Sequence, residues 1–234
     1  MGLRWIAIET WLYRLAPIEA RGRIVGFHET LIAFAGIIAP LLIVAVGAVN
    51  ASAFGLALGG LIAGCGGWIE GSLLALLPVY NSSMGFSSKD SAWLFTVFGF
   101  GAFSLQFLIG WWCDKKGVIA TAKICGLLGG IAILLAIGLG NSLPTLAIAI
   151  FILGGVTGGL LTLGMIWATL HNNGTAITHR VRQVSIIYTM LSAAGPLVSG
   201  YIISQTSSYS LFWQQLVVIF VLAIVLLKQS KPSA

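Results

Sequence analysis

The chain has 234 residues, of which 58% are hydrophobic and only 8% are charged, and its formal net charge is +6. Soluble proteins contain about 25% charged residues, so this composition excludes a soluble globular domain and indicates a membrane protein. The basic residues lie in short segments between apolar runs, which is typical of cytoplasmic loops rather than of a nucleic-acid-binding surface.

Seven apolar segments are long enough to cross a bilayer as helices, since a crossing requires about 20 residues. They occupy residues 24–46, 53–80, 91–112, 119–139, 143–170, 181–204 and 209–228. The predicted fold class is therefore all-α, a polytopic membrane protein with about seven transmembrane helices. Residues 5–13 are too short to cross, and they look like the end of a helix whose beginning is absent.

Basic residues mark the connecting segments that lie in the cytoplasm. They form four clusters, which are Arg14, Arg21 and Arg23; Lys115, Lys116 and Lys123; Arg180 and Arg182; Lys228 and Lys231. The segments at 140–142 and 205–208 carry no charge and are predicted to be external. Three spans separate the first cluster from the second, although two cytoplasmic segments must be joined by an even number. Either one basic cluster lies on the opposite side, or a helix is missing near residues 46–52; we favour the missing helix.

Three motifs carry a resemblance to a known family. The segment GWWCDKKG, residues 110–117, resembles the signature loop of the major facilitator superfamily, Gly-x-x-x-Asp-Arg/Lys-x-Gly. That loop joins the second and third helices of each six-helix half. AAGPLVSG, residues 193–200, resembles the Gly-Pro helix motif of such transporters through Gly195, Pro196 and Gly200. Upstream, IETWLYRLAPIEARGRIVGF resembles the end of helix four, the next cytoplasmic loop and the start of helix five in a bacterial subgroup.

The order of these motifs implies a domain organisation. Residues 51–234 resemble the complete C-terminal half of this fold, helices seven to twelve, and residues 1–50 resemble a remnant of the N-terminal half. Helix six has no counterpart, which agrees with the crossing that the charges indicate is missing. The resemblance implies a multi-pass protein of the bacterial inner membrane that moves a small solute by alternating access.

The resemblance also implies roles for residues of the signature loop. Gly110 would let two helices approach, Asp114 would face the N-terminus of a neighbouring helix, and Gly117 would supply a tight turn. We predict that Asp114 holds the helix that begins at Arg21 and Arg23 in one conformation and releases it in the other.

The plainer alternative is that Asp114 and Lys115 only anchor a cytoplasmic loop. This chain also departs from the family pattern after the loop. Val118 and Ile119 stand where another basic residue usually follows, so the wider charge network is expected to be weaker.

Glu70, in GGWIEGSLL, lies near the middle of the span 53–80. A charged side chain there costs about 2.5–3.5 kcal/mol on insertion scales, so it usually faces a cavity or a partner. Desolvation favours the neutral acid, which suits a proton-coupling site and also lets a structural glutamate survive in lipid. Coupling or solute binding and structural hydrogen bonding therefore both remain open.

Two further polar positions are candidates for transport. Glu29 follows His28 about 10 Å into its helix, and the two could relay protons, although adjacent residues point in different directions on a helix. Gln106 could line the cavity, as the resemblance implies, or could form a hydrogen bond between helices.

Small residues recur at the spacing that brings helices together. Gly-x-x-x-Gly steps occur at Gly55/Gly59, Gly60/Gly64, Gly67/Gly71, Gly126/Gly130, Gly154/Gly158 and Gly155/Gly159. We expect these steps to be packed against neighbouring helices. Cys65 and Cys125 are interpreted in the same way, as small packing residues.

The leading functional hypothesis is a secondary transporter, with proton coupling left open, that is incomplete as a single chain. Its partners would be the bilayer, a small solute, and a second chain or second copy that completes the cavity. The alternative is a structural or assembly membrane protein without transport. An intramembrane enzyme is disfavoured, because three scattered histidines and no clustered acids offer neither a metal site nor an activated nucleophile. No cofactor, metal or nucleic acid is expected.

Overall fold

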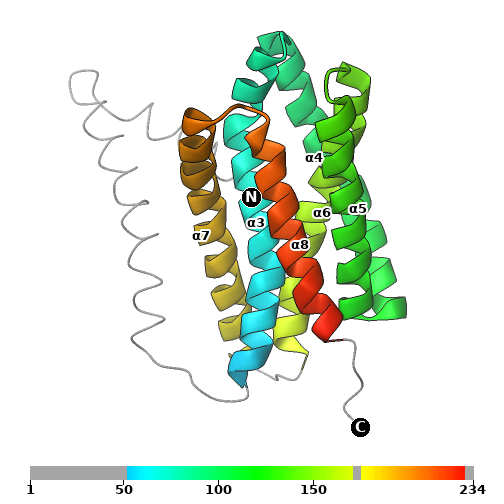
Figure 1. The fold of residues 1–234 in the computed structure, drawn as a ribbon. Helices are drawn as coiled ribbons and strands as arrows, with labels where there is room; N and C mark the ends of the chain where they lie inside the picture. Colours follow the sequence, from blue (N-terminus) through cyan, green and yellow to red (C-terminus); the bar gives the residue numbers. More distant parts are fainter. Residues whose placement is uncertain (1–51, 171–174, 230–234) are drawn as a thin grey trace, which may run out of the picture. The chain divides into compact units, whose positions relative to one another are not determined.

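A computed structural model describes residues 52–170 and 175–229, which form a bundle of long helices (Figure 1). The helices are α3 (Ser52–Ser83), α4 (Ser88–Lys116), α5 (Val118–Leu139), α6 (Leu143–Thr169), α7 (Thr175–Gln205) and α8 (Ser210–Lys228). All six are long and apolar enough to cross a membrane. They correspond to the six predicted spans from 53–80 onward, and the fold class is confirmed as all-α and polytopic. The predicted span 24–46 lies outside the described residues.

The helix boundaries follow from capping residues and turns. α4 begins with a capping box, in which the Ser87 hydroxyl accepts from the Asp90 N–H and the Asp90 carboxylate accepts from the Ser87 N–H. α6 begins at Leu143, with Pro144 in its first turn. Proline is tolerated there because backbone N–H groups of the first turn form no hydrogen bond within the helix.

One predicted boundary was wrong. α7 begins at Thr175, six residues before the predicted span 181–204, so Arg180 and Arg182 belong to its first turns instead of to a loop. The hydrophobic pattern ends where the bilayer ends, whereas the helix continues beyond it. Arg180 is largely buried and donates to the amide oxygen of Gln183 over 3.4 Å, which is one reason the helix extends here.

The direction of the helices places the basic residues at one end of the bundle. Lys116 ends α4, Arg180 lies near the start of α7 and Lys228 ends α8, and these ends lie together at the bottom of Figure 1. Lys89, at the start of α4, lies at the opposite end. The excess of basic residues assigns the first end to the cytoplasm.

α6 holds the bundle together, because it contacts α3, α4, α5 and α7. Two main clusters of buried apolar side chains lie along the bundle: one includes Tyr80 and Phe212 towards the external end, and the other includes Cys113 and Leu226 towards the cytoplasmic end. Cys65 and Cys125 are buried in the second cluster, where they pack as small apolar residues.

Candidate functional site

The candidate site lies where α3 and α7 form the most extensive contact between two described helices (Figure 1). Gly67 on α3 meets Tyr188 on α7, and one turn further on Gly71 meets Ser192. A Cβ atom at either glycine would clash with the carbonyl oxygen of the residue that it faces. Glycine at both positions therefore allows the two backbones to approach this closely.

Glu70 lies on α3 between these two glycines. The Tyr188 hydroxyl donates a hydrogen bond to its Oε2 atom, and both side chains are partly exposed. With about 1.5 Å of rise per residue, Glu70 is about 27 Å from the start of α3 and about 20 Å from its end. It therefore lies deep in the membrane, as the sequence predicts, and a phenol replaces part of its lost hydration.

A partly exposed carboxyl at this depth offers chemistry that apolar neighbours cannot. It can bind a proton, a cationic group or the hydrogen-bond donor of a solute, and such groups in membrane spans usually mark a transport pathway. The phenol adds a group that both donates and accepts hydrogen bonds. Each group of the pair can therefore change its hydrogen-bond partner, and neither is left without one.

The predicted Gly-Pro motif lies on the same helix contact, from the level of Glu70 towards the external end. A Cβ atom at Gly195 would lie 2.6 Å from the Ser72 hydroxyl and 2.8 Å from a carbonyl oxygen of α3. Ser72 and Ser199 share a buried hydrogen bond of 3.2 Å between their hydroxyls. Pro196 lies inside the helix, and Gly200 is in van der Waals range of Leu76. The motif thus joins α7 to α3.

Gln106 fulfils one of its two predicted roles. Its amide donates to the Thr162 hydroxyl on α6 over 3.0 Å, so it links two helices, and its side chain is nevertheless exposed. It lies on α4, and no hydrogen bond joins it to Glu70 within the described residues. A role in lining the cavity stays a prediction.

The segment that resembles the signature loop is almost entirely helical. α4 continues to Lys116 and α5 begins at Val118, so Gly117 alone joins them. Its φ of 79° is a conformation that glycine adopts without strain, and its N–H donates to the Cys113 carbonyl over 2.8 Å. The tight turn expected at Gly117 is present, whereas the expected loop is not.

Apart from the buried Cys113, the other residues of this segment are exposed or partly exposed. Asp114 is exposed and has no hydrogen bond or ion pair with the described part of the chain. The Lys115 ammonium lies 3.8 Å from the centroid of the Trp111 ring, a cation–π contact. No described atom lies within 4 Å of a Cβ built at Gly110, so no described helix makes the close approach expected there.

Three predicted site residues, Arg21, Arg23 and Glu29, lie outside the described residues, and so does His28. The predicted contact between Asp114 and the two arginines therefore stays a prediction. Within 52–170 and 175–229, no group of three His, Cys, Asp or Glu side chains is placed to hold a metal ion.

Comparison with known proteins identifies the family. A model of the Major Facilitator Superfamily matches residues 56–234, which include all but the first residues of the described bundle.

The chain belongs to the major facilitator superfamily.

Among its relatives, an uncharacterized MFS-type transporter of Yersinia enterocolitica is 31% identical over 156 residues, which are 64% of this chain and 39% of that protein. Uncharacterized MFS-type transporters of Yersinia pestis and Yersinia pseudotuberculosis are each 30% identical over 174 residues, 72% of this chain and 44% of theirs. The matched segments cover less than half the length of these relatives.

Family membership and the six helices establish a multi-pass membrane protein, and the Yersinia relatives agree with a bacterial inner membrane. The resemblance of the sequence motifs to the major facilitator superfamily is confirmed. The relatives are named as transporters, so the family supports transport rather than enzymatic activity.

Sequence reasoning missed Tyr188, the partner of Glu70 in this superfamily member. The only signal was a hydroxyl within the apolar span 181–204, and the two residues are 118 positions apart. Thr162, the partner of Gln106, was missed for the same reason. A polar residue within a span indicates that a partner exists, but its identity depends on which helices become neighbours.

Proposed function

We propose that this chain forms one half of a secondary transporter that moves a small solute by alternating access, with Glu70 and Tyr188 as its coupling or solute-binding pair. The hydrogen bond between a carboxylate and a phenol at mid-membrane depth carries the proposal. Membership of the superfamily supports transport in general. The partial exposure of both side chains supports access from a cavity.

The pair suits a switch because its two helices touch through glycine. The backbones of α3 and α7 approach closely at Gly67 and Gly71, where carbonyl oxygens of α7 lie against α3, so a small shift of either helix would change the Glu70–Tyr188 geometry. When Glu70 is ionised it accepts from Tyr188. When it is protonated it can donate instead, and the bond that ties the two helices is weakened.

The facing half of the cavity is expected to come from elsewhere. Transporters of this superfamily place the solute site between two six-helix halves. The matched segments cover 39–44% of the relatives' length. We therefore propose that a second polypeptide, a second copy or further chain supplies the other wall, and that the solute contacts Glu70 from that side.

Proton coupling can be tested without knowing the solute. Everted membrane vesicles that contain the chain are energised by respiration, and an acridine dye reports the pH gradient while small solutes are added singly from a panel. A solute that exchanges for protons collapses the gradient. We expect Glu70→Gln to abolish this response and Tyr188→Phe to reduce it, with equal amounts of inserted protein.

Asp90→Asn is the matched control, because Asp90 is a carboxylate at the exposed external end of α4. Its response should equal that of the original chain. Labelled-solute uptake then tests coupling that does not involve protons. If the chain, assayed in its native membrane so that a second polypeptide or second copy can complete the cavity, moves no solute in either assay, with or without Glu70, the structural or assembly hypothesis replaces transport.

The predicted contact of Asp114 with Arg21 and Arg23 is tested separately. Asp114→Cys paired with Arg21→Cys should form a disulfide in one transport state only, and the pair Asp114→Cys with Arg23→Cys provides a second measurement. Asp114 is exposed, so the substitution should not disturb the fold. No cross-link in any state contradicts the predicted contact.

A further inference from the structure

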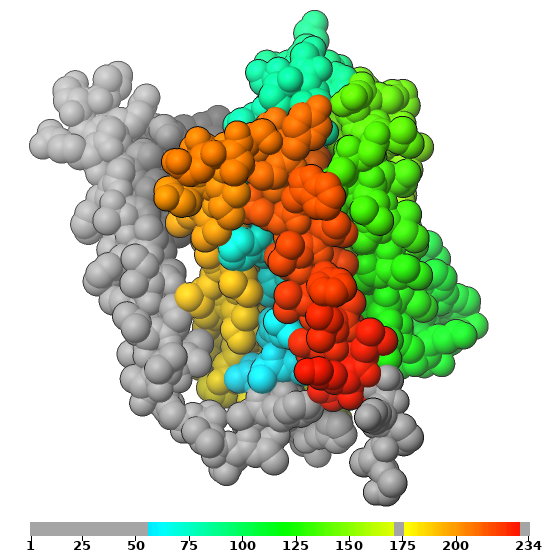
Figure 2. Space-filling model, in the orientation of Figure 1, coloured from blue at the N-terminus to red at the C-terminus, as the bar shows by residue number. Residues whose placement is uncertain are grey.

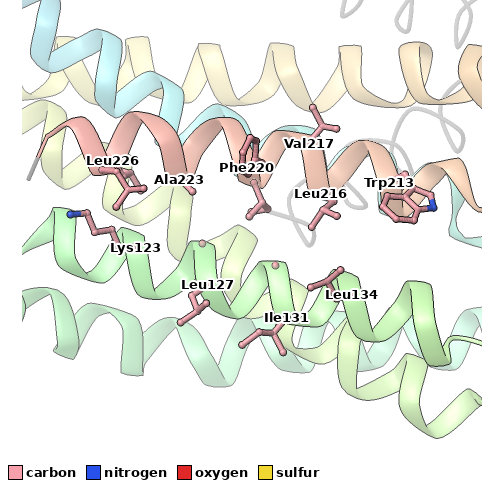
Figure 3. A pocket seen from close by; sticks show the side chains of 14 residues that line it. Lys123, Leu127, Ile131, Leu134, Trp213, Leu216, Val217, Phe220, Ala223 and Leu226 are labelled. Atoms are coloured by element: carbon pink, nitrogen blue, oxygen red, sulfur yellow. The ribbon is translucent and has the colours of Figure 1, made fainter.

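A groove of about 630 Å³ runs between α5 and α8 (Figure 3). Figure 2 shows these two helices side by side on one face of the bundle. Apolar side chains such as Leu127 and Phe220 form its walls, and Gly126 and Gly130 lie between them. A Cβ atom at Gly126 would meet no described atom within 4 Å, and one at Gly130 would lie 3.8 Å from the nearest. The described helices thus leave space here that a membrane molecule can fill.

The groove has the length of one leaflet. Its lining on α5 runs from Lys123 to Leu134, which is about 16 Å at about 1.5 Å per residue. Half of the hydrocarbon core of a bilayer is about 15 Å. Lys123 lies at one end of the groove and Trp213 near the other (Figure 3). An acyl chain that enters at Lys123 would therefore fill the groove to its far end.

The groove also has one charged end. Of the 14 residues that line it, Lys123 alone is charged. It lies in the second turn of α5, at the cytoplasmic end of the bundle, with Lys228 at the end of the adjoining helix. No carboxylate forms an ion pair with Lys123 in the described ranges. An ammonium group at this level attracts the phosphate of an anionic lipid.

We propose that this groove binds one anionic phospholipid of the cytoplasmic leaflet. Its phosphate contacts Lys123, and one acyl chain lies over Gly126 and Gly130 between α5 and α8. This lipid site is separate from the Glu70–Tyr188 site, because no residue of α3 or α7 lines the groove. The inference therefore depends only on the chain's place in a membrane, not on the proposed function.

A second copy of the chain is a poorer occupant. Two copies inserted in the same direction are related by an axis normal to the membrane, so their Lys123 side chains lie at one depth and face each other. Like charges across an interface oppose association, whereas a phosphate brings the opposite charge. Lys123 could also simply extend to the headgroup level, as exposed lysines do, without selecting a lipid.

Native mass spectrometry of the full chain distinguishes these possibilities. The chain, purified in mild detergent, is mixed with dioleoyl phosphatidylglycerol or dioleoyl phosphatidylcholine at equal concentration, and retained lipid is counted. We expect one tightly retained lipid and a preference for phosphatidylglycerol. Lys123→Gln should reduce that preference about tenfold, the value of one charge-assisted contact. Lys116→Gln removes a charge at the same end but outside the groove, and should leave the preference unchanged.

Gly126→Leu tests the acyl-chain position. The open space at this glycine accepts a larger side chain without a clash, so the variant is expected to fold. It should lower retention of both lipids about tenfold or more. Gly138→Leu is the matched control on the same helix, because that glycine is also open but does not line the groove.

Three outcomes overturn the proposal. Equal preference for phosphatidylglycerol in Lys123→Gln and Lys116→Gln means that lysine acts only as general surface charge. Full lipid retention in Gly126→Leu means that no acyl chain lies there. A dimer that Gly126→Leu dissociates means that a second copy occupies the groove.

Discussion

The same sequence feature occurs in two places with different packing: in the contact between α3 and α7, and in the groove between α5 and α8. Each has a Gly-x-x-x-Gly step, Gly67/Gly71 in the first and Gly126/Gly130 in the second. In the first, carbonyl oxygens of α7 fill the space above both glycines. In the second the space above Gly126 is open. A Cβ atom at Gly130 would lie 3.8 Å from Ile219 of α8, so among the described residues the expected packing is found at Gly130 and not at Gly126.

The difference shows what the spacing of glycines determines and what it does not. A spacing of four residues places two glycines on the same face of a helix, and their missing side chains make that face flat. What covers a flat face is decided by the neighbouring helix. α7 covers α3 with backbone carbonyl oxygens and with side chains such as Ile187 and Leu191, and it is tied to α3 by hydrogen bonds such as Tyr188–Glu70. α8 brings Ile219 close to Gly129 and Gly130 but leaves the space above Gly126 open.

The largest difference in stability is expected when the same large side chain is placed in each of the two regions. Gly71→Leu drives a side chain into the Ser192 carbonyl, so it should lower the free energy of unfolding by about 3 kcal/mol. Gly126→Leu, in the open groove, should leave that free energy nearly unchanged. SDS titration in mixed micelles, followed by circular dichroism, measures both. Equal losses would mean that the two glycine faces are equally covered.

The next effect concerns the hydrogen bond that only the tight contact has. Tyr188→Phe removes the donor to Glu70 and should lower the free energy of unfolding by about 1–2 kcal/mol. Tyr201→Phe is the control on the same helix, since Tyr201 is exposed and its hydroxyl forms no hydrogen bond with the described residues. If both variants lose the same stability, the loss comes from the hydroxyl in general and not from the pairing with Glu70.

A smaller effect is expected at the buried serine pair. Ser199→Ala removes a hydroxyl contact between α7 and α3, and such bonds in membrane proteins contribute about 0.6 kcal/mol on average. Ser204→Ala is matched to it, because the Ser204 hydroxyl donates to the Tyr201 carbonyl of its own helix. The difference between the two variants in the same SDS titration isolates the contact between helices. No difference would mean that glycine packing alone joins α3 to α7.

The sequence predicted the helices well because the membrane imposes the pattern. Apolar runs bounded by charged or turn residues located six described helices to within a few residues at most ends, for example at Lys228. The start of α7 was missed by six residues, since Arg180 and Arg182 resemble a loop in charge while the backbone remains helical. A helix that extends beyond the bilayer leaves no hydrophobic signal there.

The candidate site could be predicted only in part. An acid within an apolar span identified Glu70, because a charge at that depth requires a reason. Tyr188 and Thr162 could not be assigned as partners, since that requires knowing which helices are neighbours. The groove was missed for a related reason: glycines at this spacing look the same whether a helix covers them or leaves them open. Family motifs located Gly117 and Gly195 but not the surroundings of either.

The smallest expected effect on stability concerns Gly126→Ala, which directly tests whether the space above this glycine is open. Gly126→Ala adds one methyl group to the open groove, where it meets no described atom. Alanine favours helix over glycine by about 0.5–1 kcal/mol in water, and less is expected here because chains unfolded in detergent retain helix. In delipidated protein the SDS titration should therefore show a gain of at most about 0.5 kcal/mol. The gain should be smaller in protein that retains the proposed lipid, because the added methyl group then displaces the acyl chain over Gly126. A loss in the delipidated protein would mean that another helix packs closely on Gly126.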